Sequence, residues 1–301
     1  MTLIFWCHGR PRNRLRTPRP ASSFAGRLCQ RQSWRNSRGS ALATTTNPEV
    51  LPPAATSVPA EASVFCNDRL GLKLDQWQEE FVDSPSSRKA LVGARQCGKS
   101  TAVAGLAVHR MLTKPESSVV VVAASKRQST LLIDKCKWML RKLGFQRLTG
   151  DGSHAHSVRL PNGSTMVGLP CSAPTIRGFT ADLLVMDEAA YIPDVVYAAS
   201  RPMLAASGGD LVVMSSAHEP AGFFWEIMTR ERGASWNRTT VRAADVTRFS
   251  KEFLTEERHE LGEDAYAREY ECNFGDVDSG VFQRKTAERA LKDNLPPLFK
   301  R

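Results

Sequence analysis

The sequence predicts an α/β fold in which helices cover both faces of a mostly parallel β-sheet. Short apolar runs with the length and β-branched content of buried strands occupy residues 89–92, 118–124, 181–186 and 211–214. Helical spacing of apolar residues follows the first two of these runs, at 101–111 and 129–143. Strands that alternate with helices are typical of a parallel sheet that is covered on both faces.

Other elements are predicted in order along the chain. Residues 74–82 have the apolar spacing of a short amphipathic helix, and we expect ordered structure to begin near Leu70. Residues 157–160 and 165–169 flank an Asn-Gly turn, which predicts a β-hairpin. From residue 250 to about 274 the pattern is helical, and Gly and Pro interrupt it afterwards.

The net charge of +10 is unevenly distributed along the 301 residues. Residues 1–48 contain nine arginines, no lysine and no acidic residue, which leaves 32 basic and 31 acidic side chains for the rest of the chain. The remainder is therefore close to neutral, so the overall charge says nothing about a nucleic-acid surface on the folded part.

We expect residues 1–65 to form a disordered, Arg-rich N-terminal arm, because arginine, serine and proline dominate there without apolar periodicity. Three interpretations stay open: a flexible tail, a transit peptide, and a non-specific phosphate-binding arm. Residues 66–283 are expected to form the folded domain, and residues 284–301 a tail or linker.

The seven cysteines are scattered and form no C-x-x-C pair, so the sequence indicates neither a zinc site nor a disulfide framework. A reducing cytoplasm is the simplest compartment for such a chain. Apolar runs such as 119–124 are far too short to span a bilayer, so no membrane association is expected.

One stretch matches G-x-x-x-x-G-K-[ST], the phosphate-binding P-loop, and a strand precedes it and a helix follows it, as the motif requires. Its members are Gly93, Ala94, Arg95, Gln96, Cys97, Gly98, Lys99 and Ser100. The glycines permit turns in which backbone N–H groups point at phosphate oxygens, and the helix adds its positive N-terminal end. Lys99 is expected to reach the β- and γ-phosphates of ATP, Ser100 to hold Mg²⁺, and Thr101 to complete the nucleotide-binding residues.

Two acids, Asp187 and Glu188, directly follow the apolar run 181–186. Ligands of open α/β sheets bind at the carboxyl ends of strands, so these side chains should meet the P-loop, which lies 88 residues earlier at Lys99. Asp187 suits the second Mg²⁺ contact, and Glu188 can accept a proton from water that attacks the γ-phosphate.

Two other residues have both an ordinary and a functional interpretation. Gln78 lies 15 residues before Gly93, and its amide either faces solvent or reads the edge of an adenine. Arg95 is either an exposed loop arginine or a contact to the γ-phosphate or to a neighbouring subunit's nucleotide. Cys97 is expected to be a tolerated small loop residue.

Several motifs in one order resemble the ATPase half of the large terminase subunit of tailed phages, the motor that packages DNA into a procapsid. The resemblance covers about residues 70–283. It is carried by Gln78, the Arg-bearing loop 93–100, Ile176-Arg177-Gly178, the run 184–188, Ser215-Ser216-Ala217 with Gly222-Phe223-Phe224, and the closing run 269–274.

The resemblance implies a three-layer P-loop NTPase of the RecA-like type, with a β-hairpin insertion and a short C-terminal helical segment. It implies that Gln78 reads adenine, that Arg95 is the Walker A arginine, and that Ser215, Ser216 and Ala217 couple hydrolysis to movement. It further implies ATP and Mg²⁺ as cofactors. The implied partners are double-stranded DNA, a small terminase subunit, a portal and a homo-oligomeric ring, in the cytoplasm of a bacterial host.

Terminases of this type continue into an RNase H-like nuclease, whereas only 27 residues follow Phe274, so no nuclease activity is expected. A rival enzyme is a helicase, since 187–190 approximate a DEAD-type box, but helicases need a second RecA-like lobe that the pattern does not show. A non-enzymatic rival is a degenerate prophage fragment that binds ATP without turnover.

Overall fold

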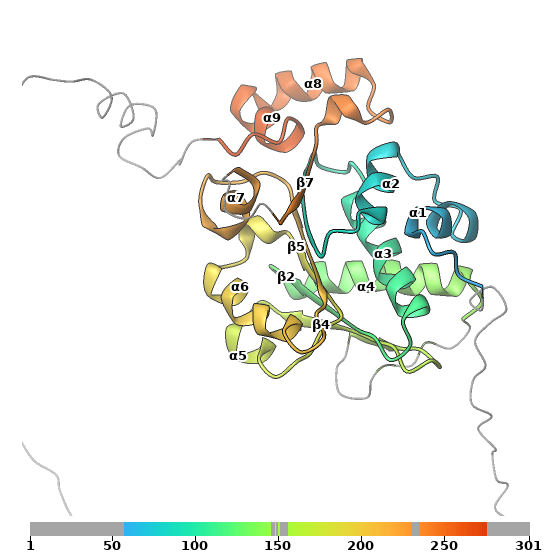
Figure 1. Ribbon diagram of the computed structural model, residues 1–301. Helices are drawn as coiled ribbons and strands as arrows, with labels where there is room; N and C mark the ends of the chain where they lie inside the picture. The colour runs from blue at the N-terminus through green and yellow to red at the C-terminus, as the bar shows by residue number, and fades with distance from the viewer. Residues whose placement is uncertain (1–56, 146–147, 149, 151–155, 230–234, 276–301) are drawn as a thin grey trace, which may run out of the picture. The chain divides into compact units, whose positions relative to one another are not determined.

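A seven-stranded sheet forms the centre of the computed structural model, which describes residues 57–145, 148, 150, 156–229 and 235–275 (Figure 1). The strand order is β3-β4-β2-β5-β6-β1-β7, and every pair is parallel except the antiparallel pair β3–β4. The strands are β1 (Arg88–Gly93), β2 (Ser118–Ala123), β3 (Ser157–Arg159), β4 (Thr165–Pro170), β5 (Leu183–Asp187), β6 (Asp210–Ser215) and β7 (Asn237–Val241). The predicted α/β fold with a mostly parallel sheet is confirmed.

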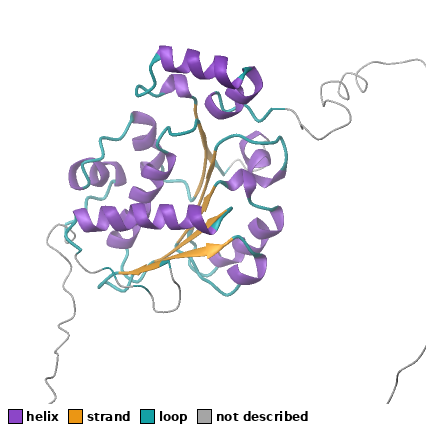
Figure 2. Cartoon of the chain, turned by 180° about the vertical axis from the view of Figure 1, so that it is seen from behind, coloured by secondary structure: helices purple, strands orange, loops and turns teal. Residues whose placement is uncertain are grey.

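Helices cover the two faces of the sheet in two groups, which Figure 2 shows from behind. One face packs against α1 (Ala62–Val64), the π-helical turn η2 (Phe65–Arg69), α2 (Gln76–Asp83), α3 (Lys99–Thr113) and α4 (Lys126–Lys142). The other face packs against α5 (Ala173–Ile176), η3 (Ala189–Tyr191), α6 (Asp194–Ser200), η4 (Arg201–Leu204) and α7 (Gly222–Thr229). None of the helices among the described residues is long and apolar enough to cross a membrane.

The two cores follow from the alternation of side chains along each strand. Val119 and Val121 of β2 point into the core with α3 and α4, and Val120 and Val122 point into the opposite core. All four are fully buried, which explains why the strand is a continuous apolar run in the sequence and not an alternating one.

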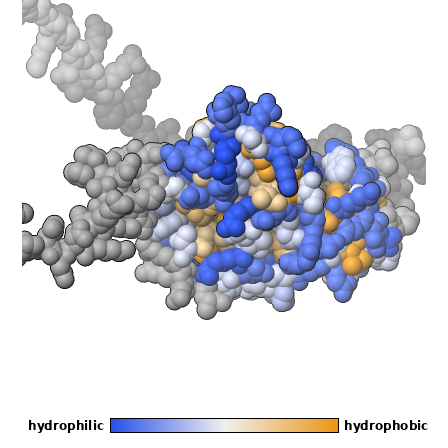
Figure 3. All heavy atoms as spheres, turned by 90° about the horizontal axis from the view of Figure 1, so that it is seen from above, coloured by the Kyte–Doolittle hydropathy of each residue, from blue (hydrophilic) through white to orange (hydrophobic). Residues whose placement is uncertain are grey.

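The chain after β7 forms η5 (Ala243–Asp245), α8 (Lys251–Leu261) and α9 (Glu263–Tyr270), which confirms the predicted C-terminal helical segment. These helices lie over the top of the domain in Figure 1. Seen from above, this face is mostly hydrophilic (Figure 3), in agreement with α8, in which no residue is buried. Tyr266 and Tyr270 of α9 are buried and anchor the pair to the core.

The predicted hairpin is present as β3–β4, and β4 also pairs in parallel with β2, so the hairpin extends the main sheet. The edge strand β7 was not predicted, because its sequence is polar and only Val241 of the strand is buried. Polar edge strands lack the apolar signal on which strand prediction depends.

Ordered structure also begins before Leu70, the predicted start. Ala62 and Phe65 pack in the core with α3, and Phe65 is fully buried. The predicted boundary of the arm at residue 65 is therefore too late, and residues 57–65 belong to the folded domain. The predictions for residues 1–56 and 276–301 lie outside the described residues.

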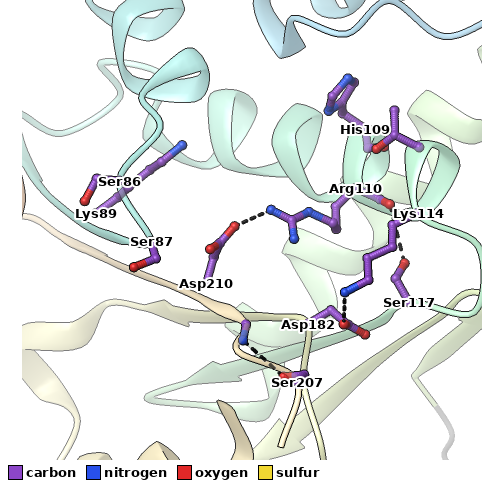
Figure 4. Close-up of polar contacts among 12 residues, drawn as sticks. Ser86, Ser87, Lys89, His109, Arg110, Lys114, Ser117, Asp182, Ser207 and Asp210 are labelled. Carbon is purple, nitrogen blue, oxygen red and sulfur yellow. Dashed lines mark hydrogen bonds and ion pairs between the residues drawn. The ribbon is translucent and has the colours of Figure 1, made fainter. Parts of the chain in front are cut away.

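Ionic contacts join the C-terminal end of α3 to the amino-terminal ends of the strands, at the edge of the sheet shown in Figure 4. Arg110 of α3 pairs with Asp210 of β6, and Lys114 pairs with Asp182 at 2.5 Å. A pocket of about 500 Å³ lies beside them, between α3 and the loop that leads into β1. These contacts fix the end of α3 to the strands beneath it.

Lys89 of β1 lines the same pocket and is only 5% exposed. Its ammonium donates a hydrogen bond to the Val82 carbonyl at 3.0 Å. Burial lowers the pKa of Lys89 to about 8, although Asp210 opposes the shift. The buried charge therefore destabilises the fold at neutral pH, where the ammonium stays protonated.

We predict that the start of the folded domain is set by the packing of η2. Deletion of residues 1–69 removes Phe65 and its neighbours from the core, which should cost on the order of 5 kcal/mol and lower the Tm by roughly 10–20 °C. Deletion of residues 1–56 leaves all of the described packing in place and should not change the Tm. Calorimetry of both truncations checks this, and equal melting temperatures would contradict it.

Lys89 should also produce a measurable pH dependence of stability. Between its folded pKa of about 8 and the unfolded value of about 10.4, the unfolded chain holds a proton that the folded chain has released, so stability rises with pH. Lys89→Met removes the buried charge and should be more stable than the parent at neutral pH. This difference in the free energy of unfolding should shrink by roughly 2–3 kcal/mol between pH 7.5 and 10.5.

Urea unfolding across this pH range measures the difference between variant and parent. Lys126→Met, at an exposed lysine, provides the matched control and should show a difference from the parent that does not vary with pH. A pH-independent difference for Lys89→Met would show that Lys89 does not titrate in this window.

Candidate nucleotide-binding site

The predicted site residues meet at the carboxyl edge of the sheet because β6 pairs in parallel with both β1 and β5. Val92 of β1 lies opposite Ser215, and Asp187 of β5 lies opposite Met214. The P-loop, the acidic pair and the serine element therefore leave three adjacent strands at one edge.

The P-loop connects β1 to α3, and α3 begins at Lys99, as predicted for the helix that contributes its positive end. Gly98 has a φ of 102°, so it does supply the left-handed turn that the motif requires. Gly93 is needed for a different reason from the predicted one: a Cβ there would lie 2.8 Å from Cys97 Sγ and 3.1 Å from Lys99 Cδ. The loop is thus compact around the lysine stem.

Lys99 lies over the loop that it belongs to. Its Nζ donates to the carbonyl of Gly93 at 2.7 Å and to that of Ala94 at 3.0 Å. Ser100 and Thr101 lie in the first turn of α3 and are partly exposed. Lys135 of α4 donates to Thr101 Oγ1 at 3.1 Å, which brings a second cation to this side of the loop.

Asp187 is a buried carboxylate at the end of β5. The backbone N–H of Glu188 donates to its Oδ1 at 3.0 Å. Burial, with the charge of Glu188 beside it, raises the pKa of Asp187 to about 6. A bound cation favours the ionised form, and Mg²⁺ prefers such oxygen ligands, so Asp187 and the Ser100 hydroxyl have the chemistry of a magnesium site.

Glu188 follows with a backbone φ of 53°, the left-handed region that a glutamate rarely adopts. Its Oε2 accepts a hydrogen bond from the buried Ser215 hydroxyl at 3.1 Å. The contact joins the predicted general base to the first residue of the predicted coupling element. Ser216 is partly exposed, and Ala217 is buried in the second core.

The ordinary interpretation of Gln78 predicts that its amide faces solvent. The structure contradicts this, because Gln78 is only 4% exposed. Its Oε1 accepts from the Asp75 N–H at 2.8 Å within the N-terminal cap of α2, and its Nε2 donates to the Gly98 carbonyl at 3.1 Å. The structure therefore shows a bridge from α2 to the P-loop, and adenine recognition stays a prediction.

The loop residues Arg95, Gln96 and Cys97 differ in their surroundings. The Arg95 side chain is 70% exposed, and its Nη1 lies 3.5 Å from Glu269 Oε1 of α9. Gln96 is exposed, with a φ of 57°. Cys97 is fully buried, and burial raises the pKa of its thiol, as expected for a packing residue.

Sequence reasoning missed two cations at this site, Lys135 and Arg248. Arg248, between η5 and α8, donates to the Cys97 carbonyl and to Asp75 Oδ2. Lys135 belongs to a helix with several other exposed basic residues, and no local pattern distinguishes it. Arg248 follows a polar strand that was itself not predicted, so no spacing connected it to the P-loop.

Residues 90–289, about two thirds of the chain, match the family described as terminase large subunit, T4likevirus-type, N-terminal. The chain belongs to this family. The matched region is the N-terminal part of a terminase large subunit, the family that the resemblance predicted.

Solved structures of terminases share the fold. The large terminase ATPase domain of Thermus phage P74-26 has a TM-score of 0.61 and 22% identity, covering 70% of this chain and 97% of that one. The large terminase of another thermophilic bacteriophage, in complex with ADP, has a TM-score of 0.58 and 16% identity (67% and 54% covered). The HK97 bacteriophage large terminase has a TM-score of 0.56 and 16% identity (66% and 50% covered). This terminase chain thus spans about half the length of the last two.

Proposed function

We propose that this terminase domain hydrolyses ATP with Mg²⁺ through Lys99, Ser100, Asp187 and Glu188, and that the reaction drives the translocation of double-stranded DNA. The observation that supports the proposal is the meeting of the P-loop, the buried Asp187 and the Ser215-bound Glu188 at one edge of the sheet. This arrangement supplies phosphate binding, metal ligands and a base.

In the proposed reaction the P-loop N–H groups bind the phosphates, and Lys99 exchanges the carbonyls of Gly93 and Ala94 for the β- and γ-phosphate oxygens. Ser100 and Asp187 would hold Mg²⁺, which when bound neutralises charge on those oxygens. Glu188 accepts the proton of the attacking water. The water oxygen bonds to the γ-phosphorus as the bond to the bridging oxygen breaks, giving ADP and phosphate.

Ser215 gives the coupling proposal a physical basis. Its hydroxyl donates a hydrogen bond to Glu188 at 3.1 Å. A movement of the Glu188 side chain after phosphate release would therefore displace the end of β6. Ser216 and Ala217 continue from that strand toward α7. We propose that this element transmits the reaction to movement.

The roles of Gln78 and Arg95 are part of the same proposal. With its carbonyl and one N–H engaged, Gln78 offers its second N–H to an adenine. Arg95 can leave Glu269 and contact the γ-phosphate or a neighbouring subunit's nucleotide, since its own side chain is exposed and the two charged atoms lie 3.5 Å apart. The proposed setting is a homo-oligomeric ring with a small terminase subunit and a portal, in the cytoplasm of a bacterial host.

Binding and chemistry should separate at Lys99 and Glu188. Lys99→Ala removes a charge contact to the phosphates and should weaken ATP binding itself. Glu188→Gln keeps the shape of the side chain and removes the base, so ATP should still bind while turnover falls by roughly 10²–10⁴-fold. Filter binding measured beside phosphate release tests both variants.

Glu256→Gln, at an exposed glutamate of α8, is the matched control and should keep the parent rate. Hydrolysis by Glu188→Gln at the parent rate would show that another group activates the water. If the parent protein binds ATP but releases no phosphate, the result would favour the alternative that the chain is a degenerate prophage fragment without turnover.

We expect weak ATPase activity that rises with DNA or with oligomerisation, because a neighbouring subunit's arginine can stabilise the transition state. We expect no DNA cleavage, because Asp187 and Glu188 are assigned here to ATP hydrolysis, and the resemblance places the metal-binding acids of the nuclease in a different, RNase H-like domain. Plasmid DNA should therefore stay intact with Mg²⁺ or Mn²⁺. Metal-dependent cutting that survives Glu188→Gln would overturn this expectation.

A further inference from the structure

One guanidinium joins two parts of the nucleotide site that are far apart in the sequence. Arg248 Nη1 donates to Asp75 Oδ2 at 2.8 Å, at the N-terminal cap of α2, and Nη2 donates to the backbone carbonyl of Cys97 in the P-loop. A Cβ on the adjacent Gly98 would lie 3.2 Å from Nη2. The arginine is therefore packed directly against the phosphate-binding turn.

The direction of the loop carbonyls explains why this contact matters. A P-loop binds phosphate with some of its backbone N–H groups, and a carbonyl of the turn that faces away from the phosphates needs a donor from elsewhere in the protein. Arg248 supplies the donor for Cys97, whereas the Gly98 carbonyl accepts from Gln78 in addition to the first N–H groups of α3. Two successive carbonyls are thus held by side chains, one of them through a charge-assisted bond.

The segment that carries Arg248 holds the loop from its other side as well. The Ala94 N–H donates to the Val241 carbonyl at 2.8 Å, and the Arg95 N–H donates to the Glu269 carbonyl at 2.9 Å. Residues 241–270 therefore contact the P-loop at three points. Arg248 contacts the P-loop with its Nη2, while its Nη1 contacts Asp75 at the cap of α2.

We infer that Arg248 is a positioning residue for the nucleotide site, which fixes the carbonyl face of the P-loop so that its N–H groups stay directed at the phosphates. The inference rests on the proposed ATP binding at this loop. Arg248 does not contact the reacting atoms itself, and its effect is on the geometry of the loop.

The surroundings of Arg248 indicate that its side chain contributes little to the stability of the fold. Its side chain is 44% exposed, and an exposed ion pair contributes little to stability. The backbone on either side is anchored by other residues: Val246 is buried, and the Phe249 ring packs edge-on against Tyr270 at 6.3 Å. Loss of the guanidinium should leave this anchoring intact.

The test uses Arg248→Met in the full chain, with ATP and inorganic tripolyphosphate as ligands. We expect affinity for both to fall on the order of tenfold, the equivalent of one charge-assisted hydrogen bond, with a Tm within a few degrees of the parent. Arg248→Lys should restore less than half of the loss, because an ammonium cannot bridge Asp75 and Cys97 as a planar guanidinium does. Arg127→Met, at an exposed arginine of α4, should bind as the parent does.

Steady-state kinetics give the second measurement, in which KM should rise more than kcat falls. Unchanged affinity of Arg248→Met for both ligands would overturn the inference, and so would full recovery with lysine. Loss of ATP affinity with unchanged tripolyphosphate affinity would also overturn it, because Arg248 would then act on the base or the sugar. Failure of the parent itself to bind ATP would instead refute the proposed function.

Discussion

The position of β6 between β1 and β5 is the constraint on which the rest of the site depends. Both pairings are parallel, so the carboxyl ends of all three strands lie at one edge. The P-loop, the acidic pair and the serine element together span more than a hundred residues of sequence, from Gly93 to Ser215. The packing of two apolar cores keeps the strands in this order, and so the same packing determines the geometry of the site.

The two acids at that edge differ in how the protein holds them. Asp187 is surrounded by protein, which raises its pKa to about 6, and a bound cation would favour the ionised form. Glu188 is held in a left-handed backbone conformation and by the Ser215 hydroxyl. Strained backbone of this kind persists only where surrounding contacts hold it, and here the contact is with the end of a neighbouring strand. The acid expected to move with the reaction is therefore already connected to the sheet.

The sequence was sufficient for features that local patterns determine. The P-loop, the acids after β5 and the buried strands depend on short motifs and apolar runs, and all lie where they were predicted. The edge strand β7 was missed because its residues are polar, and Lys135 and Arg248 were missed because only the tertiary fold brings them to the loop. Gln78 was singled out by its spacing, but spacing does not show its contact with Asp75 in the helix cap or with the Gly98 carbonyl.

The contacts that Val241, Arg248 and Glu269 make with the P-loop have a thermodynamic consequence for regulation. Ligand linkage is reciprocal: if a partner that binds α8 or α9 changes nucleotide affinity by some factor, the nucleotide changes the affinity for that partner by the same factor. The hydrophilic outer surface of α8 is accessible to such a partner, and α9 carries the Glu269 carbonyl that holds the loop. Each nucleotide state then corresponds to its own affinity for whatever binds these two helices.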